Sequence, residues 1–392
     1  MNDNLLNTDI SFYQKRTSIP IYCICLFFLC FSYGLSSIYI FANNGIVYEL
    51  NIVIQILTYP ILIALIVNAK YSLKQFWLIG IVGLIFIIEF YCNHSTNWLR
   101  YYLLFLASRK VKFVDIVRTL LISFVSILVL GVTLYFIGIS NSGVGRRGAI
   151  ACGFVQPNIL SMVVITIVFL IVTLQGSIKK SSIVLIITTI VFIGIVSKTQ
   201  TAIIVLLLLP CIYSWVKRGV NKNRKLVKLF IVGSQVMVLI ASCLLIYFYP
   251  KPFFTPFRDK IDMLFTYRPY LNYNNFTRYG FTLFGQKANF TNTSEYAYNY
   301  FTGMLSNQRY NTVDNAYVTQ IIAIGVVTII PVYVFYIKMM KKAMNNKKYM
   351  VITIAILCSC YAFLENNYNE AYYFFPFFYL MSMDSNNFKN KS

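Results

Sequence analysis

Twelve apolar stretches, separated by short polar segments, constrain this chain more than any other feature of its sequence. A helix that crosses the hydrocarbon core of a bilayer needs about 20 mostly apolar residues. Hydrophobic residues make up 58% of the 392-residue chain and charged residues 12%, against about 25% charged residues in soluble domains. This composition excludes a soluble enzyme, a disordered regulator and a disulfide-stapled secreted module. It predicts an all-α membrane protein, folded as a single polytopic domain over residues 1–392.

Ten of the stretches are clear candidate spans and two are short. The apolar stretch 182–215 is too long for one span, and its break at residues 197–200 predicts two antiparallel helices. The short stretches 97–107 and 371–383 count as partial spans, because omitting either one alone would destroy the charge asymmetry described next. The clear candidates are 21–41, 51–68, 76–92, 117–139, 158–175, 182–196, 200–215, 228–249, 315–337 and 349–364.

The basic residues are distributed unevenly between the two sides of this predicted bundle. The net charge of +22 comes from short Lys and Arg clusters between apolar runs, which argues against a nucleic-acid partner. With the N-terminus inside, 23 of the 34 basic residues fall on the inner side. Cytoplasmic loops carry such a positive excess. The sequence therefore predicts about 12 transmembrane helices with both termini in the cytoplasm.

One outer loop is much longer than the others and extends over residues 250–313. Within it, Thr255 and Pro256 form an N-cap followed by proline at the first helical position. Apolar residues at helical spacing follow, so we expect a short helix near 256–265. Its apolar face is expected on the outer membrane interface or on the bundle.

Two outer segments carry cations and amides next to helix ends. Glycine-rich residues 148–153 precede the sixth span, and the tip of the 182–215 hairpin is almost without a loop. Arginine offers a planar fork that suits phosphate oxygens, whereas the alternative is a solvated surface loop and a lysine that snorkels to the interface. The candidate substrate-binding residues here are Arg146, Arg147, Gln156, Asn158 and Lys198.

A second group lies in the long loop and at the outer ends of the last spans. Each of these residues alone could be an interfacial polar group, but the predicted topology places all of them on one membrane face. The candidate carboxylates are Asp314 and Glu365, and the other candidates are Arg268, Arg278, Asn315 and Tyr317.

Two further features predict structure rather than chemistry. Glu89 and Arg100 lie near the outer ends of adjacent antiparallel spans, so we expect a structural ion pair between them. The sequence contains no metal-ligand cluster, phosphate-binding loop or nucleotide fingerprint. We therefore expect neither a metal site nor a cofactor.

The order of these motifs resembles a known family. The segment R-G-x4-G-F-x-x-P-N over residues 147–158 is followed by S-K-T at 197–199, then by L-F-G at 283–285, and then by D-N-x-Y at 314–317 with Gly325 beyond. This order is similar to that of bacterial polysaccharide polymerases, the Wzy-type proteins of the O-antigen ligase/polymerase group. The chain departs from the family in having Lys198 where arginine is more usual.

The resemblance implies a metal-independent glycosyltransferase with a GT-C-like architecture in the bacterial cytoplasmic membrane. Its substrate would be an oligosaccharide repeat unit linked to undecaprenyl pyrophosphate, polymerised at the outer face. Cations would meet the charge of the leaving pyrophosphate, and Asp314 or Glu365 would orient or deprotonate the acceptor hydroxyl. Membrane lipid and a chain-length regulator would be its other partners.

Two alternatives remain open from the sequence. An O-antigen ligase is the nearest enzyme, although the related ligases carry a histidine in the large loop, where this chain has none. A lipid-linked oligosaccharide flippase or another secondary transporter would have a similar number of spans. Transporters usually show internal repeat symmetry, which this sequence lacks.

Overall fold

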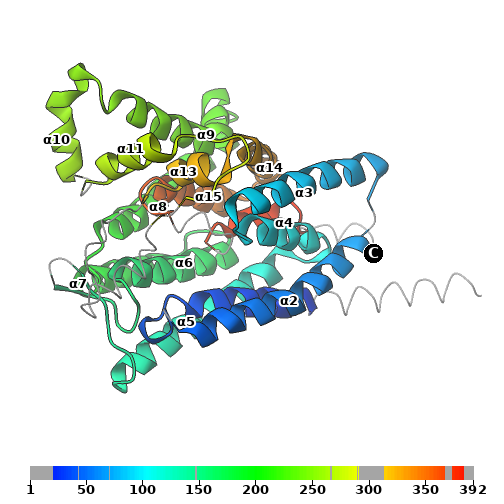
Figure 1. Ribbon diagram of the computed structural model, residues 1–392, viewed down its shortest axis with the longest axis horizontal. Coiled ribbons are helices and arrows are strands. Elements are labelled where there is room, and N and C mark those ends of the chain that lie inside the picture. The colour runs from blue at the N-terminus through cyan, green and yellow to red at the C-terminus, as the bar shows by residue number, and fades with distance from the viewer. Residues whose placement is uncertain are drawn as a thin grey trace, which may run out of the picture.

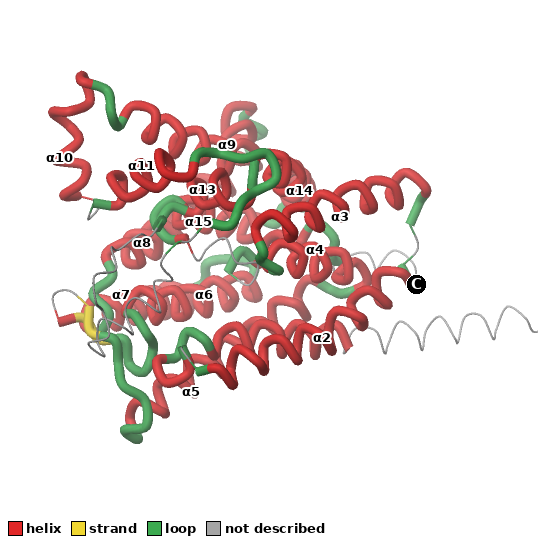
Figure 2. The backbone as a smooth tube through the Cα atoms, viewed as in Figure 1, coloured by secondary structure: helices red, strands yellow, loops and turns green. Residues whose placement is uncertain are grey.

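The computed structural model describes residues 21–42, 44–69, 71–145, 148–264, 267–288, 290, 313–366 and 373–383. Within these ranges the chain is almost entirely helical, and the only strands are β1 (Val144–Gly145) and β2 (Ala149–Ile150), which pair antiparallel beside α7 (Figure 2). The predicted all-α class is confirmed.

Six helices are long and apolar enough to cross a membrane by length and composition, and three shorter apolar helices accompany them. This set is that of a multi-pass membrane protein. The six are α2 (Gly45–Val67), α3 (Leu73–Asn93), α5 (Phe113–Phe136), α6 (Pro157–Gln175), α8 (Gln200–Asn221) and α9 (Lys225–Phe248). The shorter ones are Ile21–Leu35, α7 (Lys180–Ile195) and α15 (Tyr349–Ala362).

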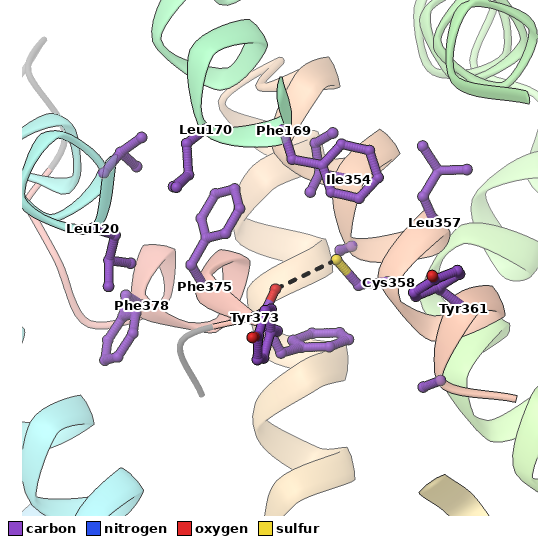
Figure 3. Close-up of a cluster of buried hydrophobic side chains, with 14 of the residues drawn as sticks. Leu120, Phe169, Leu170, Ile354, Leu357, Cys358, Tyr361, Tyr373, Phe375 and Phe378 are labelled. Atoms are coloured by element: carbon purple, nitrogen blue, oxygen red, sulfur yellow. Dashed lines mark hydrogen bonds between the residues drawn. The ribbon is translucent and has the colours of Figure 1, made fainter. Parts of the chain in front are cut away.

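The centre of the bundle is formed by α6 and α15, which are buried on nearly all faces. Residues 373–383 pack against both, with Phe375 beside Leu170 of α6 and the Cys358 thiol donating to the Tyr373 carbonyl at 3.7 Å (Figure 3). By contrast, α2 and α3 expose large apolar side chains such as Ile56 and Trp77. Apolar outer faces of this kind suit contact with lipid.

The remaining elements are short except for α14 (Val326–Asn345), which has 20 residues. The predicted partial span 97–107 is a helix of 11 residues, and a helix stands where the sequence predicts one near 256–265. These elements are η1 (Tyr39–Phe41), α4 (Asn97–Ala107), η2 (Ser108–Lys110), η4 (Pro252–Phe254), α10 (Thr255–Leu264), α11 (Arg268–Tyr279), α13 (Ala316–Thr319), η5 (Gln320–Ile324), α14 (Val326–Asn345) and η7 (Phe375–Tyr379).

The predicted continuous span 315–337 is wrong, because the helix is interrupted at Gly325. The helical turns of α13 and η5 end there, Gly325 adopts φ 91° and ψ 150°, and α14 begins at the next residue. The Thr282 carbonyl accepts from the Val326 amide at 2.9 Å, and the Ala323 carbonyl accepts from the Gln286 amide at 3.2 Å. Residues 282–286 of the long loop therefore replace the missing helical hydrogen bonds.

The predicted span 371–383 is also wrong as a helix. Its described part contains only the five-residue 3₁₀ helix η7. The segment nevertheless extends along the bundle to the residues just before α5, where the Met383 amide donates to the Val111 carbonyl at 2.9 Å. Lys342 holds this segment by donating to the carbonyls of Tyr379, Leu380 and Ser382 at 2.8–2.9 Å. The Lys342 ammonium thus satisfies backbone carbonyls that a regular helix would satisfy with its own amides.

Helices α2 and α6 run roughly parallel across Figure 1, so the bundle has two ends. Lys110 donates to the Asn68 carbonyl and Lys342 to the segment 379–382, so the loops that carry the basic clusters meet at one end, here called the basic end. The segments 137–145 and 148–156, the hairpin tip at 197–199 and α11 lie at the other end, here called the site end. The Ile150 amide donates to the Val196 carbonyl there at 2.9 Å.

Candidate active site

Arg268 lies between two carboxylates at the site end. Its Nε is 3.1 Å from Asp314 Oδ2 and its Nη2 is 3.0 Å from Glu365 Oε1. The three side chains are largely buried, with exposed fractions of 16%, 19% and 8% in the order Arg268, Asp314 and Glu365. We refer to these three residues as the ion triad.

The first turn of α11 fixes the position of Arg268. Arg268 and Pro269 open the helix, and the chain reaches them through Tyr267 in a left-handed conformation at φ 61°. The buried Asp262 carboxylate accepts from the Tyr270 amide at 3.2 Å and from the Tyr249 hydroxyl at 2.6 Å. A carboxylate on a first-turn amide stabilises a helix N-terminus, so Asp262 ties α11 to the end of α9.

Asp314 is held through the residues that follow it. Asn315 caps α13, and its Oδ1 accepts from the amides of Tyr317 and Val318 at 2.9 and 3.2 Å. Its Nδ2 donates to Ser242 of α9 at 3.1 Å. The buried Tyr317 hydroxyl donates to the Ser359 carbonyl of α15 at 2.8 Å. In this structure, Asn315 and Tyr317 therefore hold Asp314 in place.

Glu365 follows the last turn of α15, where its amide donates to the Tyr361 carbonyl at 2.9 Å. Arg268 also donates to the neighbouring Leu364 carbonyl. From α6, the Asn158 amide donates to Glu365 Oε1 across a long contact of 3.4 Å. Side chains from α6 and α11 thus converge on the Glu365 carboxylate.

The ion triad carries one negative charge when both carboxylates are ionised. Burial raises the pKa of Asp314 above its ordinary value, and Arg268 opposes that shift. Burial also raises the pKa of Glu365; Arg268 opposes this shift, and the charge of Asp314 adds to it. Burial lowers the pKa of Arg268, but Glu365 and Asp314 outweigh it and raise the pKa overall. The arginine stays charged, and the carboxylates are more basic than free ones.

A cavity of about 240 Å³ adjoins the ion triad. Its walls come from α9, α10, α11, Asn315 and the residues just after α15. Arg268, Asn272 and Asn315 supply its polar lining, and the rest is apolar. This cavity gives a ligand access to Arg268.

The predicted cationic hairpin tip lies against the start of α6. Ser161 bonds to the hydroxyls of Ser197 and Thr199 at 2.6 and 2.9 Å. Lys198 is exposed, adopts φ 49° and places its ammonium 3.7 Å from where a Cβ on Gly148 would stand. The first turn of α6 therefore connects the hairpin tip, through Ser161, with the ion triad, through Asn158.

Two of the other predicted residues lie at helix ends, and two lie outside the described part of the chain. Gln156 is half-buried at the N-cap position of α6, and its side chain does not cap the helix. Arg278 is exposed at the end of α11 and lies over the ring of Tyr279 at 5.3 Å. Arg146 and Arg147 lie outside the described residues.

The expected ion pair between Glu89 and Arg100 does not form. The buried Glu89 accepts from Asn93 one turn away at 3.0 Å, whereas Arg100 donates to Asn97 at 2.9 Å and lies over the ring of Tyr33. Each side chain bonds to an asparagine within four residues of it, and the prediction from facing antiparallel helices overlooks these local partners.

No family model, curated protein or solved structure matches this chain. Within the described ranges, no group of three or more His, Cys, Asp or Glu residues is placed to hold a metal ion. The function is therefore inferred from the chemistry of the ion triad and its surroundings.

Two site residues are missing from the sequence predictions. Asp262 is on the polar side of the predicted helix near 256–265, where it looks like a solvated charge. Asn272 belongs to a polar run in α11 that gives no periodic signal. The only sequence feature that draws attention to Asn272 is the group of Asn272, Asn274 and Asn275, because asparagine is a poor helix former and three of them within one helix are unexpected.

Proposed function

We propose that this protein is a metal-independent glycosyltransferase that polymerises oligosaccharide repeat units linked to undecaprenyl pyrophosphate into a surface polysaccharide. The observation that carries the proposal is the ion triad at the end of the bundle opposite the basic clusters. Because the positive-inside rule assigns basic loops to the cytoplasm, the site end would face outward from the bacterial cytoplasmic membrane. Lipid-linked repeat units would be joined there into O-antigen, capsule or exopolysaccharide.

The raised pKa of the two carboxylates supports a role as general base. A base whose pKa lies closer to the working pH transfers protons more effectively. In the proposed step, Asp314 or Glu365 takes the proton of an acceptor hydroxyl, and the hydroxyl oxygen bonds to the anomeric carbon of the donor. The bond from that carbon to the pyrophosphate breaks, and the lipid pyrophosphate leaves.

The ion pairs of Arg268 favour a positioning role for this residue over direct binding of the diphosphate. Its guanidinium is already paired with two carboxylates, and a diphosphate beside this net negative group would be repelled. We assign the leaving group to the cations of the hairpin tip and the preceding loop, namely Lys198, Arg146 and Arg147. The exposed position of Lys198 beside Gly148 supports this assignment.

One observation favours a second candidate. The helix broken at Gly325 has the discontinuous form found at the binding sites of secondary transporters. A flippase for lipid-linked oligosaccharide would use the same substrate without forming a glycosidic bond. In that case the carboxylates would bind or relay ions.

Cells that lack the chromosomal gene and carry Asp314→Asn or Glu365→Gln on a plasmid separate the candidates. A polymerase predicts that single repeat units reach the cell surface while the ladder of longer chains disappears. A flippase predicts loss of single units as well. A ligase predicts polymer that stays on the lipid carrier.

The control variant for this experiment is Lys222→Ala, in a loop at the basic end, which should leave the ladder unchanged. A normal ladder in both carboxylate variants would contradict the proposal.

A further inference from the structure

The cavity beside Arg268 has one polar group without a partner. Asn272 of α11 is 4% exposed and lines the cavity, and its Oδ1 accepts no hydrogen bond. The other amide in the lining, Asn315, uses its Oδ1 and Nδ2 on α13 and on Ser242. A buried acceptor without a donor is destabilising, and a hydroxyl or amide donor of a ligand would remove that cost.

We infer that this cavity binds one pyranose ring, with the side-chain amide of Asn272 turning so that its covered Oδ1 accepts from a ring hydroxyl. The inference rests on the proposed function only where it assigns this ring to the acceptor substrate. The ability of the cavity to bind a glycoside does not depend on that function. Asn272 is then a binding residue for the sugar.

The charge of the ion triad selects a neutral ligand over an anion. The paired Arg268 offers its charge to Asp314 and Glu365 and leaves a net negative group in the cavity wall. The remaining walls include Leu245, Ile261 and Phe363, and apolar walls make a small hydrated cation costly to bind. A ligand with hydroxyl donors and an apolar ring face suits both parts of the lining.

The size of the cavity limits the ligand to about one ring. Its 240 Å³ lies just below the roughly 300–1,000 Å³ of typical small-molecule sites. Because Arg268 belongs to both the lining and the ion triad, a hydroxyl of this ring would lie close to Asp314 and Glu365. This position is that of the acceptor hydroxyl in the proposed reaction.

The test measures binding of a panel of methyl pyranosides to the full-length protein in nanodiscs, by saturation-transfer NMR. We expect at least one pyranoside to bind the wild type, and Asn272→Leu to weaken its binding at least fivefold. Asn274→Leu is the matched control, because Asn274 is exposed on the same helix, and it should bind as the wild type does.

A second variant keeps the test decisive if Asn272→Leu fails to fold. Ala241→Phe changes an exposed residue of the cavity wall, so it should block binding without disturbing the core. Binding of no pyranoside to the wild type, or unchanged binding in both Asn272→Leu and Ala241→Phe, would overturn the inference. Loss of pyranoside binding when NaCl or KCl replaces choline chloride at constant ionic strength would overturn the inference in favour of a cation site.

The two carboxylate variants, taken together, separate this inference from the proposed function. Polymer formation by both Asp314→Asn and Glu365→Gln, with Asn272-dependent pyranoside binding by the wild type, would contradict only the proposed function. Loss of polymer in both variants, with no pyranoside binding by the wild type, would contradict only the cavity assignment.

Discussion

Arg268 is the residue on which both buried carboxylates depend. Replacing it with alanine leaves Asp314 and Glu365 close together without a cation, and removing one partner of a buried ion pair costs about 3–5 kcal/mol. We expect Arg268→Ala to lower the midpoint of thermal unfolding of the purified protein clearly. Arg278→Ala, at the exposed end of the same helix, should change it little. Equal midpoints for the two variants would contradict the account of the ion triad.

The ion triad also predicts a pH dependence of stability. Burial raises the pKa of Glu365 above its ordinary 4.5 and that of Asp314 above 3.8, so the folded protein binds protons that the unfolded chain has released. The stability from this effect is complete below about pH 4 and is lost as the pH rises through the folded-state pKa values.

We therefore expect the wild type to lose stability relative to Glu365→Gln as the pH rises from 4 to neutral. Thermal unfolding at several pH values, in one detergent and at constant ionic strength, measures this difference. A difference that shifts in favour of the wild type would show that Arg268 lowers the Glu365 pKa more than burial raises it.

At the scale of elements, Gly325 and Gly285 allow the long loop to join the broken helix. A Cβ on Gly325 would lie 2.2 Å from the Gly285 amide nitrogen, and Gly325 has φ 91°. A side chain in that conformation costs roughly 1–3 kcal/mol before any clash. We expect Gly325→Ala to destabilise the protein by about 3 kcal/mol or more, measured by denaturant or thermal unfolding.

Gly80→Ala is the matched control, because a Cβ there meets nothing within 4 Å. In a helix interior this change is neutral or stabilises by up to about 1 kcal/mol. If Gly325→Ala were as stable as Gly80→Ala, the contact between residues 282–286 and the helix break would not matter for folding.

The elements differ in how far the sequence predicts them. The partial span 97–107 corresponds to α4 because its apolar run and polar flanks mark both ends. The sequence does not predict the break at Gly325, because a helix tolerates one glycine within an apolar run. The break becomes evident only from the hydrogen bonds that residues 282–286 make to it. The segment 373–383 has the composition of a span, but lysine bonds to its carbonyls replace a helix there.

The site residues show the same limit. Arg268, Asp314 and Glu365 each stand out in the sequence as charges next to apolar runs. Their mutual pairing, and with it the positioning role that we propose for Arg268, depends on how α11 folds back onto the end of α15. Asp262, which anchors that turn through Tyr249, looks like an ordinary surface charge in the sequence.

At the scale of the whole molecule, the two ends predict the orientation in the membrane. In a background without native cysteine, Asn274→Cys at the site end should react with a membrane-impermeant thiol reagent added to intact cells or spheroplasts. Lys222→Cys at the basic end should react only after the membrane is permeabilised. The reverse pattern would contradict the placement of the ion triad on the outer face.

The central claim is that the ion triad carries out glycosyl transfer without a metal. The most direct measurement uses purified protein in nanodiscs with lipid-linked repeat units and EDTA, and follows release of the lipid pyrophosphate together with chain length. We predict release and chain growth by the wild type and by Lys222→Ala. Asp314→Asn and Glu365→Gln should each lose at least tenfold in rate, which corresponds to about 1.4 kcal/mol or more of transition-state stabilisation. Wild-type rates in both carboxylate variants, or no chain growth by the wild type until a divalent cation is added, would contradict the claim.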